Sequence, residues 1–159
     1  MLKKYSINIL YQFSINFDFK LGSIVKRFFV IKKPDVKELK QRLSQLEYHV
    51  TQEKGTEPAF TGEYVNSKEK GNYHCIVCDA NLFKSESKFE SGTGWPSFFK
   101  GEENNIQVNS DYSHNMIRSE VTCNICKSHL GHVFDDGPMP TKKRYCINSC
   151  SLYFKNKSN

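Results

Sequence analysis

Short apolar runs separated by turn-forming residues make up most of the chain after residue 55. Aromatic and β-branched side chains gather in residues 72–74, 106–108, 116–122 and 144–154, and Gly, Asn, Asp and Pro lie between them. Runs of this length, bounded in this way, are typical of strands in antiparallel sheets. Alternating helices and strands, as in a parallel sheet, would give a different pattern. The chain is therefore predicted to be mainly β.

One short helix is expected ahead of these strands. Four aliphatic residues recur at the spacing of one helical face: Val36, Leu39, Leu43 and Leu46. Asp35, followed three residues later by Glu38, resembles a capping box that would start this helix. We expect the helix to cover one face of the β domain.

The positive charge of the chain is concentrated at its N-terminus. The formal net charge is +6, from 23 Lys and Arg residues and 17 Asp and Glu residues. Residues 1–33 hold seven of the basic residues and one of the acids, which leaves 16 of each for the rest of the chain. Because the body of the chain is neutral, its charge gives no support to a broad nucleic-acid-binding surface.

Three segments are predicted: a basic extension, residues 1–33, that is either a targeting segment or disordered; a domain, residues 34–154; and a polar tail, residues 155–159. The extension is acid-poor, basic and apolar, as transit peptides are, but it holds only three Ser and no Ala. No uncharged stretch reaches the ~18 residues of a membrane span. We expect a cytoplasmic protein, or a mitochondrial or plastid one if residues 1–33 are a transit peptide.

Four of the six cysteines form two Cys-X-X-Cys pairs. Cys75 and Cys78 make the first pair, and Cys123 and Cys126 make the second, 48 positions later. Each pair supplies two sulfur ligands from one tight turn, and two pairs complete a four-thiolate zinc site. A redox-active Cys-X-X-Cys is the alternative for either pair alone. We predict one structural zinc ion per chain and, without a secretory signal, a reducing compartment.

The two remaining cysteines lie in the run of residues 144–154. If this run is one strand, Arg144, Cys146, Asn148 and Cys150 share a face. The cation of Arg144 would favour the nucleophilic thiolate of Cys146, whereas Cys150 leads into an apolar end and resembles a core residue. The plainer alternative is that both are small buried hydrophobes, as free cysteines usually are.

Two further clusters contain candidate functional residues. Trp95, the only tryptophan, lies between Gly94 and Pro96 in a Gly-rich loop. A lone tryptophan usually belongs to a core, but this position is typical of a pocket wall. His129 and His132 follow the second cysteine pair and could be metal ligands. Because four thiolates already complete a tetrahedral site, they become candidates for proton transfer near neutral pH.

These motifs occur together in one known family. The chain resembles the B-type methionine sulfoxide reductases, which reduce the R epimer of peptide methionine sulfoxide. The resemblance covers roughly residues 37–154, and the matching stretches are residues 48–57, the Gly-Trp-Pro-Ser-Phe loop at 94–98, residues 129–138 and residues 144–149. Such matches, in a fixed order around a suspected reactive cysteine, are more specific than any single motif.

The resemblance implies two antiparallel sheets in a β-tent, with a structural zinc site remote from the active site. It implies an oxidoreductase that repairs oxidised proteins or peptides under oxidative stress. Cys146 would be the nucleophile and pass through a sulfenic acid, and Trp95 would hold the methyl group of the substrate. Further roles in proton transfer, oxygen orientation and thiolate stabilisation fall to His129, His132, Asn148 and Arg144.

One position departs from a common pattern of that family. Many members place a recycling cysteine where this chain has Thr93. On a strand, the Cα atom of Cys150 would lie about 13 Å from that of Cys146, beyond the ~7 Å limit for a disulfide. A helical turn would bring the two cysteines closer, so this exclusion depends on the strand. We therefore expect the sulfenic acid to be reduced directly by thioredoxin or a small thiol, and we expect the protein to be a monomer.

Two other functions fit part of the sequence. A non-enzymatic zinc-binding module, with a pocket for ligand or protein recognition, needs only the two cysteine pairs. A zinc-ribbon nucleic-acid binder is disfavoured by the neutral body of the chain. Neither function requires Cys146, the two histidines and Trp95 together.

Overall fold

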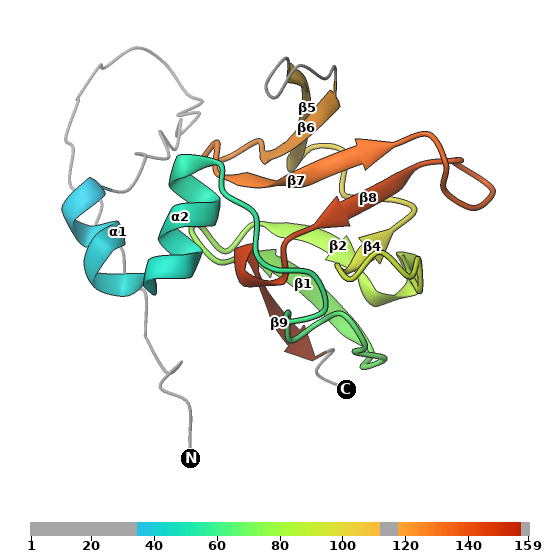
Figure 1. The fold of residues 1–159 in the computed structure, drawn as a ribbon, viewed down its shortest axis with the longest axis horizontal. Coiled ribbons are helices and arrows are strands. Elements are labelled where there is room, and N and C mark those ends of the chain that lie inside the picture. Colours follow the sequence, from blue (N-terminus) through green and yellow to red (C-terminus); the bar gives the residue numbers. More distant parts are fainter. Residues whose placement is uncertain (1–34, 112–117, 157–159) are drawn as a thin grey trace, which may run out of the picture. The chain divides into compact units, whose positions relative to one another are not determined.

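The computed structural model describes residues 35–111 and 118–156 (Figure 1). The predicted extension, residues 1–33, lies outside this range, as do residues 157–159. Helices and strands follow in this order: α1 (Val36–Arg42), α2 (Gln45–Glu53), β1 (Gly71–Cys75), β2 (Asn81–Lys84), β3 (Lys88–Phe89), β4 (Ser97–Phe98), β5 (Ile106–Asp111), β6 (Arg118–Cys123), β7 (His129–Phe134), β8 (Arg144–Ile147) and β9 (Leu152–Asn156). Two short 3₁₀ turns are described as well, η1 (Ser85–Ser87) and η3 (Ser149–Ser151).

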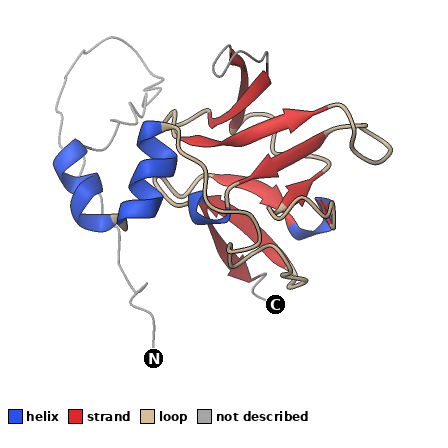
Figure 2. Ribbon diagram, viewed as in Figure 1, coloured by secondary structure: helices blue, strands red, loops and turns tan. Residues whose placement is uncertain are grey.

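The strands form two antiparallel sheets, which confirms the predicted fold class (Figure 2). The smaller sheet has the order β2-β1-β9, and the larger has the order β3-β4-β8-β7-β6-β5. Strands β8 and β9 belong to different sheets and are joined by Asn148 and η3. The chain therefore crosses from one sheet to the other directly after β8.

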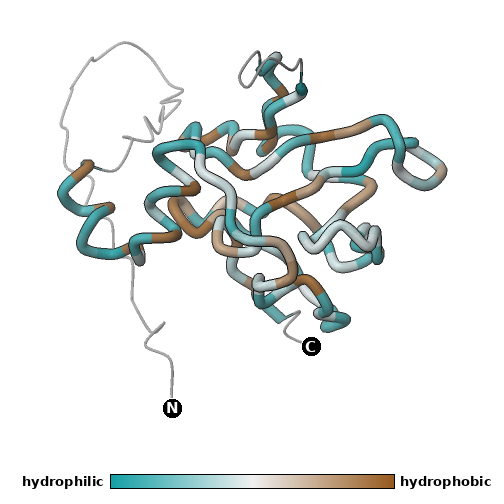
Figure 3. The backbone as a smooth tube through the Cα atoms, in the orientation of Figure 1, coloured by the Kyte–Doolittle hydropathy of each residue, from teal (hydrophilic) through white to brown (hydrophobic). Residues whose placement is uncertain are grey.

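Aromatic side chains from both sheets make up the centre of the core. Tyr73 of β1 and Phe83 of β2 both contact Phe98 of β4, with ring centroids 5.1 and 4.4 Å apart. All three are fully buried. Burial of a large apolar side chain contributes about 1.5–3 kcal/mol, so these contacts hold the sheets together. Along the chain, short hydrophobic stretches alternate with hydrophilic ones (Figure 3).

The predicted N-terminal helix is two helices. The chain is extended at Leu43 and Ser44, and α2 begins immediately afterwards. Ser44 and Glu47 form a complete capping box, in which Ser44 Oγ accepts from the Glu47 N–H at 3.2 Å and Glu47 Oε2 accepts from the Ser44 N–H at 2.7 Å. This box satisfies the first donors of a new helix and ends the old one. Asp35, the predicted cap, makes no such side-chain bond.

The four aliphatic residues of the predicted face consequently separate. Leu39 and Leu43 are buried in the core, whereas Val36 and Leu46 are 57% and 42% exposed. The Arg42 guanidinium, at the end of α1, donates to the carbonyl oxygens of Ile76 and Val77 at 2.9 and 2.7 Å. Helix α1 thus attaches to the turn after β1, and α2 packs against β7 and η3.

The predicted single strand over residues 144–154 is also wrong, because η3 interrupts it. The backbone N–H groups of Ser149 and Cys150 donate to the carboxylate of Glu57, at 2.6 and 2.9 Å. Glu57 lies about 90 positions before these residues, so a local pattern of apolar residues cannot predict this interruption of the strand. Cys146 and Cys150 do not lie on one strand, so the strand spacing cannot exclude a disulfide between them.

Neither helix described in residues 35–111 and 118–156 is long and apolar enough to cross a membrane.

Candidate active site and metal centre

The four cysteines of the two pairs come together after β1 and β6. Their Sγ atoms all lie within 4.8 Å of one another. The Sγ atoms of Cys75 and Cys126 are 3.6 Å apart, and those of Cys78 and Cys123 are 3.5 Å apart. Tetrahedral Zn–S bonds of about 2.3 Å would place the sulfurs about 3.8 Å apart, so the spacing fits a bound metal ion.

The two cysteine turns are built alike. In each, the N–H of the first cysteine donates to a carbonyl oxygen five residues later, at 2.8 and 2.9 Å. Asp79 and Lys127 follow the second cysteines and are left-handed, with φ of 66° and 64°. The two close thiol contacts described above each join one pair to the other. This arrangement suits a shared metal ion better than a redox couple within either pair.

A second group of predicted residues lines a pocket of about 170 Å³. Strands β7 and β8 provide four of its eight lining residues, and the others come from β6, the Gly-rich loop and two further loop positions. The lining residues are Thr56, Trp95, Arg118, Gly131, His132, Phe134, Cys146 and Asn148. The pocket brings together four of the predicted site residues: Trp95, His132, Cys146 and Asn148. The other two, His129 and Arg144, are not among the lining residues.

Strand pairing places His132 directly opposite Cys146 in the β7–β8 register. The preceding residue, Gly131, permits the close approach of the two strands. A Cβ atom at Gly131 would lie 2.1 Å from the carbonyl oxygen of Cys146, which no side chain could tolerate. The glycine between the two histidines therefore sets the distance between the histidine strand and the cysteine strand.

Cys146 is half-buried, and its Sγ lies 3.8 Å from Thr93 Oγ1. Burial raises the pKa of the Cys146 thiol, and it outweighs the opposing effects of Thr93 and Arg144. The effect of the Arg144 cation was predicted correctly from the sequence, but the larger effect of burial was not. The pKa of the Cys146 thiol is therefore raised overall, although Arg144 acts on it in the predicted direction.

Arg144 is held by a carboxylate. Its Nε and Nη2 atoms donate to the two oxygens of Asp136, each at 2.9 Å, and its guanidinium lies 4.4 Å from the centre of the Phe134 ring. The bidentate pair fixes the direction of the guanidinium. It also places a negative charge near Cys146 that opposes the effect of Arg144 on the thiol.

The two histidines have separate carboxylate partners. Asp111 Oδ2 lies 3.0 Å from His132 Nε2 and 3.1 Å from Arg118 Nη2. Glu120 Oε1 lies 2.8 Å from His129 Nδ1. A carboxylate on one ring nitrogen fixes the orientation of an imidazole. The two rings contact each other with centroids 5.5 Å apart.

His129 differs from His132 in being buried, with 3% of its surface exposed. Burial lowers the pKa of His129 by more than Glu120 raises it, so the ring is neutral at neutral pH. Its Nε2 atom is buried and has no hydrogen-bond partner in the described part of the chain. With Nδ1–H directed at Glu120, Nε2 can accept a proton or hydrogen bond but has none to give.

Trp95 and Asn148 are both fixed by backbone groups. Trp95 Nε1 donates to the carbonyl oxygen of Glu57 at 3.1 Å. The side-chain amide of Asn148 donates to the Leu130 carbonyl at 2.9 Å and accepts from the Glu57 N–H at 3.0 Å. The oxygen and an N–H of this amide are thus engaged by the backbone, so Asn148 is better placed to hold the pocket than to react.

The acidic partners of the site were not predicted from the sequence. They are Glu57, Asp111, Glu120 and Asp136. Glu57 does stand at the end of the matching stretch 48–57, and Thr93 was singled out only as a departure from the family pattern. No local pattern pairs an acid with a histidine on another strand, so these contacts had no direct signal in the sequence.

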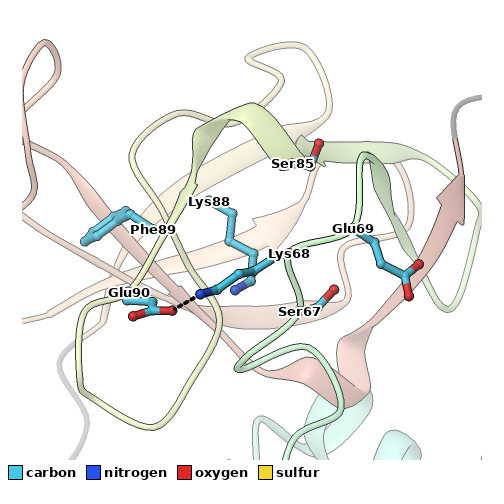
Figure 4. Close-up of a pocket in the computed structure, with 7 residues that line it drawn as sticks. All are labelled: Ser67, Lys68, Glu69, Ser85, Lys88, Phe89 and Glu90. Carbon is cyan, nitrogen blue, oxygen red and sulfur yellow. Dashed lines mark ion pairs between the residues drawn. The ribbon is translucent and has the colours of Figure 1, made fainter.

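Another cavity, of about 260 Å³, lies around the start of β3 (Figure 4). It is lined by Ser67, Lys68, Glu69, Ser85, Lys88, Phe89 and Glu90. Lys68 points toward Glu90 and pairs with it at 3.3 Å, and Lys88 Nζ donates to the Val65 carbonyl at 2.8 Å. None of the predicted site residues is among its lining residues, and these include no thiol or imidazole.

Residues 43–156 match the SelR domain family. The match spans 114 of the 159 residues, and the chain belongs to this family, the B domain of methionine-R-sulfoxide reductases. The chain is accordingly an oxidoreductase, a peptide-methionine (R)-S-oxide reductase that acts on oxidised protein substrates. The interpretation as a non-enzymatic zinc-binding module is therefore wrong.

Among solved structures, the Mis18 "Yippee-like" domain is similar to part of the chain. The two share 18% sequence identity with a TM-score of 0.46, over 57% of this chain and 100% of that one. The family assignment does not depend on this weaker similarity.

Replacing Cys123 with Ser should lower the metal content and the melting temperature together. A metal site absent from the unfolded chain adds its binding free energy to the stability of the fold. Metal per chain and thermal unfolding are the measurements, and Cys150→Ser is the control because it removes a thiol outside the cluster. A metal-free Cys123→Ser protein with the melting temperature of the parent would contradict the structural role.

Alkylation of Cys146 should accelerate with rising pH, with a midpoint above the ordinary pKa of a cysteine thiol. Burial favours the neutral thiol, so less thiolate is present at neutral pH than at a free cysteine. In a Cys150→Ser background, iodoacetamide labelling of the peptide containing Cys146 measures this midpoint. Arg144→Gln should move it further upward, whereas Arg144→Lys should move it less. A midpoint below that of a free thiol would refute the effect assigned to burial.

Proposed function

We propose that Cys146 is the nucleophile with which the chain reduces methionine-R-sulfoxide, and that the reaction passes through a cysteine sulfenic acid. One arrangement supports this role most strongly: the thiol of Cys146 faces His132 across the β7–β8 pair, in a pocket that Trp95 also lines. A thiol, a group able to carry a proton and an aromatic wall are what sulfoxide reduction needs in one place.

The Cys146 thiolate attacks the sulfoxide sulfur in this mechanism and forms a transient sulfur–sulfur bond, while the substrate oxygen takes up a proton. The sulfur–oxygen bond of the substrate and the transient sulfur–sulfur bond then break, and the oxygen ends on Sγ of Cys146. Methionine is released, and the thiol has become a sulfenic acid, so the cysteine sulfur is oxidised by two electrons while the substrate sulfur is reduced by two. The proton lost by the thiol remains with the transferred oxygen.

His132 is the proposed carrier of that proton, because it lines the pocket opposite Cys146 and Asp111 fixes its ring. His129 does not line the pocket, and its neutral ring has no proton to give from Nε2. We assign His129 the role of supporting the His132 ring from behind through their edge contact. Arg144 and Thr93 favour the thiolate and partly offset the effect of burial.

Trp95 would hold the methyl group of the sulfoxide. Its ring is fixed through Nε1, so its apolar face forms a rigid wall. Because the sulfoxide sulfur is chiral, fixing the methyl group and the oxygen leaves only one epimer with its sulfur facing Cys146. Selection of a single epimer then follows from the separate positions of Trp95, His132 and Cys146.

Zinc is the metal we propose for the four-thiolate cluster. Four sulfur ligands are typical of structural zinc, which would supply a rigid link between the two turns. The register of β6, β7 and β8 sets Cys146 level with Glu120, two strands away, and Cys123 stands three residues further along β6. Two strand spacings of about 4.8 Å and three residue rises of about 3.3 Å separate Cys123 from Cys146 by about 14 Å, so the cluster is too far from Cys146 to take part in the reaction.

Recycling by an external thiol is proposed for the sulfenic acid. Thr93 offers no sulfur, although it is the side chain next to Cys146 Sγ. Burial, together with the Glu57 carboxylate, raises the pKa of Cys150 well above its ordinary range, so this thiol is a poor nucleophile. Thioredoxin or a small thiol would form a mixed disulfide with Cys146 and release water. A second thiol would then restore Cys146 and leave as a disulfide.

Turnover of separated epimers of a blocked methionine sulfoxide with dithiothreitol tests the reaction. We expect the R epimer alone to be reduced, and Cys146→Ser to abolish turnover because a hydroxyl is a far weaker nucleophile at neutral pH. Cys150→Ser is the matched control and should keep most of the activity. Dithiothreitol-dependent turnover by Cys146→Ser would remove Cys146 from the mechanism.

The recycling route is tested by mass spectrometry after one equivalent of the R epimer. Reduced, metal-loaded protein should carry a sulfenic acid at Cys146 that a dimedone probe captures, with no intramolecular disulfide. Thr93→Cys places a sulfur within about 4 Å of Cys146, so this variant should instead form a disulfide between the introduced thiol and Cys146. A Cys146–Cys150 linkage in most molecules of the parent protein would refute direct reduction.

A further inference from the structure

We infer that Glu57 is a positioning residue of the reductase site, which fixes the wall formed by Trp95 relative to the segment that carries Cys146. This inference rests on the roles proposed above for Cys146 and Trp95. Glu57 does not line the pocket and is not expected to touch the substrate. Its effect would pass through the hydrogen bonds that it makes to both sides of the site.

The backbone of Glu57 joins two parts of the pocket that are distant in sequence. Its carbonyl oxygen accepts from Trp95 Nε1 at 3.1 Å, and its N–H donates to Asn148 Oδ1 at 3.0 Å. One residue thus contacts the aromatic wall on one side and the residue after β8 on the other. Asn148 in turn donates to the Leu130 carbonyl on β7.

The side chain of Glu57 holds the turn that follows β8. Oε1 accepts from the Ser149 N–H at 2.6 Å, and Oε2 accepts from the Cys150 N–H at 2.9 Å. The residue is 3% exposed, and such a carboxylate is costly to bury unless both oxygens are bonded. Because both oxygens are engaged by adjacent N–H groups, the carboxylate determines where β8 ends and η3 begins.

The loop that carries Glu57 is packed closely against η3 at a second point. A Cβ atom at Gly62 would lie 2.4 Å from Ser149 Cβ and 2.7 Å from Glu57 Oε1. The loop therefore has little room to shift over η3. Any displacement of the Glu57 carboxylate would move Ser149, Asn148 and the end of the Cys146 strand together.

This coupling matters because sulfur attack depends on distance. The reacting sulfurs must approach to about 3–3.5 Å, and a displacement of about 1 Å can cost a hundredfold in rate. In the proposed mechanism the methyl group rests on Trp95, so the separation of Trp95 and Cys146 sets the approach of the two sulfurs. Glu57 is hydrogen-bonded to Trp95 on one side and to the segment that follows the Cys146 strand on the other.

Glu57→Gln tests the inference, because it keeps the shape of the side chain but turns one acceptor into a donor that faces a backbone N–H. We expect kcat on the R epimer of a blocked methionine sulfoxide to fall about 10- to 100-fold while KM changes less than about threefold. Trp95 is the only tryptophan, so its fluorescence reports on this wall alone. Its emission should shift to the red and become more accessible to acrylamide.

Glu47→Gln is the matched control. Glu47 also accepts from a backbone N–H, that of Ser44 at 2.7 Å, and lies on α2, which packs against η3. It has no contact with Trp95 or Asn148 among the bonds of the described residues. We expect this variant to lower the melting temperature without changing kcat or the emission of Trp95.

Two outcomes would overturn the inference: a folded, metal-loaded Glu57→Gln with the kcat of the parent, or a lower kcat with unchanged Trp95 emission. If Glu57→Gln does not fold, Glu57→Asp must show the same losses at full metal content, because its carboxylate is shorter by one methylene. Parental kcat in that variant also overturns the inference. Absence of Cys146-dependent turnover in the parent protein would instead refute the proposed function, and the emission of Trp95 would still test its link to Glu57.

Discussion

The contact between the two cysteine turns is the constraint on which the rest of the structure depends. One turn follows β1 in the smaller sheet and the other follows β6 in the larger, so the cluster joins the sheets at one end. The chain is only 38% apolar, which limits the core available to hold two sheets together. A metal ion shared by four thiolates would add its binding free energy to the stability of the fold, and so would compensate for the small apolar core.

With the sheets joined there, the site forms where the chain crosses between them. Strand pairing alone puts His132 opposite Cys146, and Gly131 allows the strands to approach. The orientation of the side chains comes from four carboxylates on other segments, which direct the two histidines, Arg144 and the turn after β8. The strands therefore set the positions of His132 and Cys146, and the acids set the directions of the side chains around them.

The sequence predicted those features that depend on local pattern or on fixed spacing. The antiparallel strands and the grouping of the four cysteines followed from short apolar runs and from Cys-X-X-Cys spacing. The family, and with it the division into two sheets, followed from the long matching stretches. The break between α1 and α2 depends on the Ser44–Glu47 capping box, which lies inside the apolar repeat that predicts one continuous helix from Asp35. The break after β8 could not be predicted, because the acceptor for Ser149 and Cys150 is Glu57, about 90 positions earlier. The pKa of Cys146 depends on burial, which appears only once the sheets are packed.

Both cysteines outside the cluster have raised thiol pKa values, for different reasons. Burial acts on Cys146 against the help of Arg144, whereas burial and Glu57 act together on Cys150. Oxidation of cysteine by peroxides follows the thiolate fraction, so neither thiol is an easy target for the oxidants that create methionine sulfoxide. For Cys146 as the nucleophile that we propose, a largely protonated thiol would limit its loss to these oxidants while the enzyme works under oxidative stress.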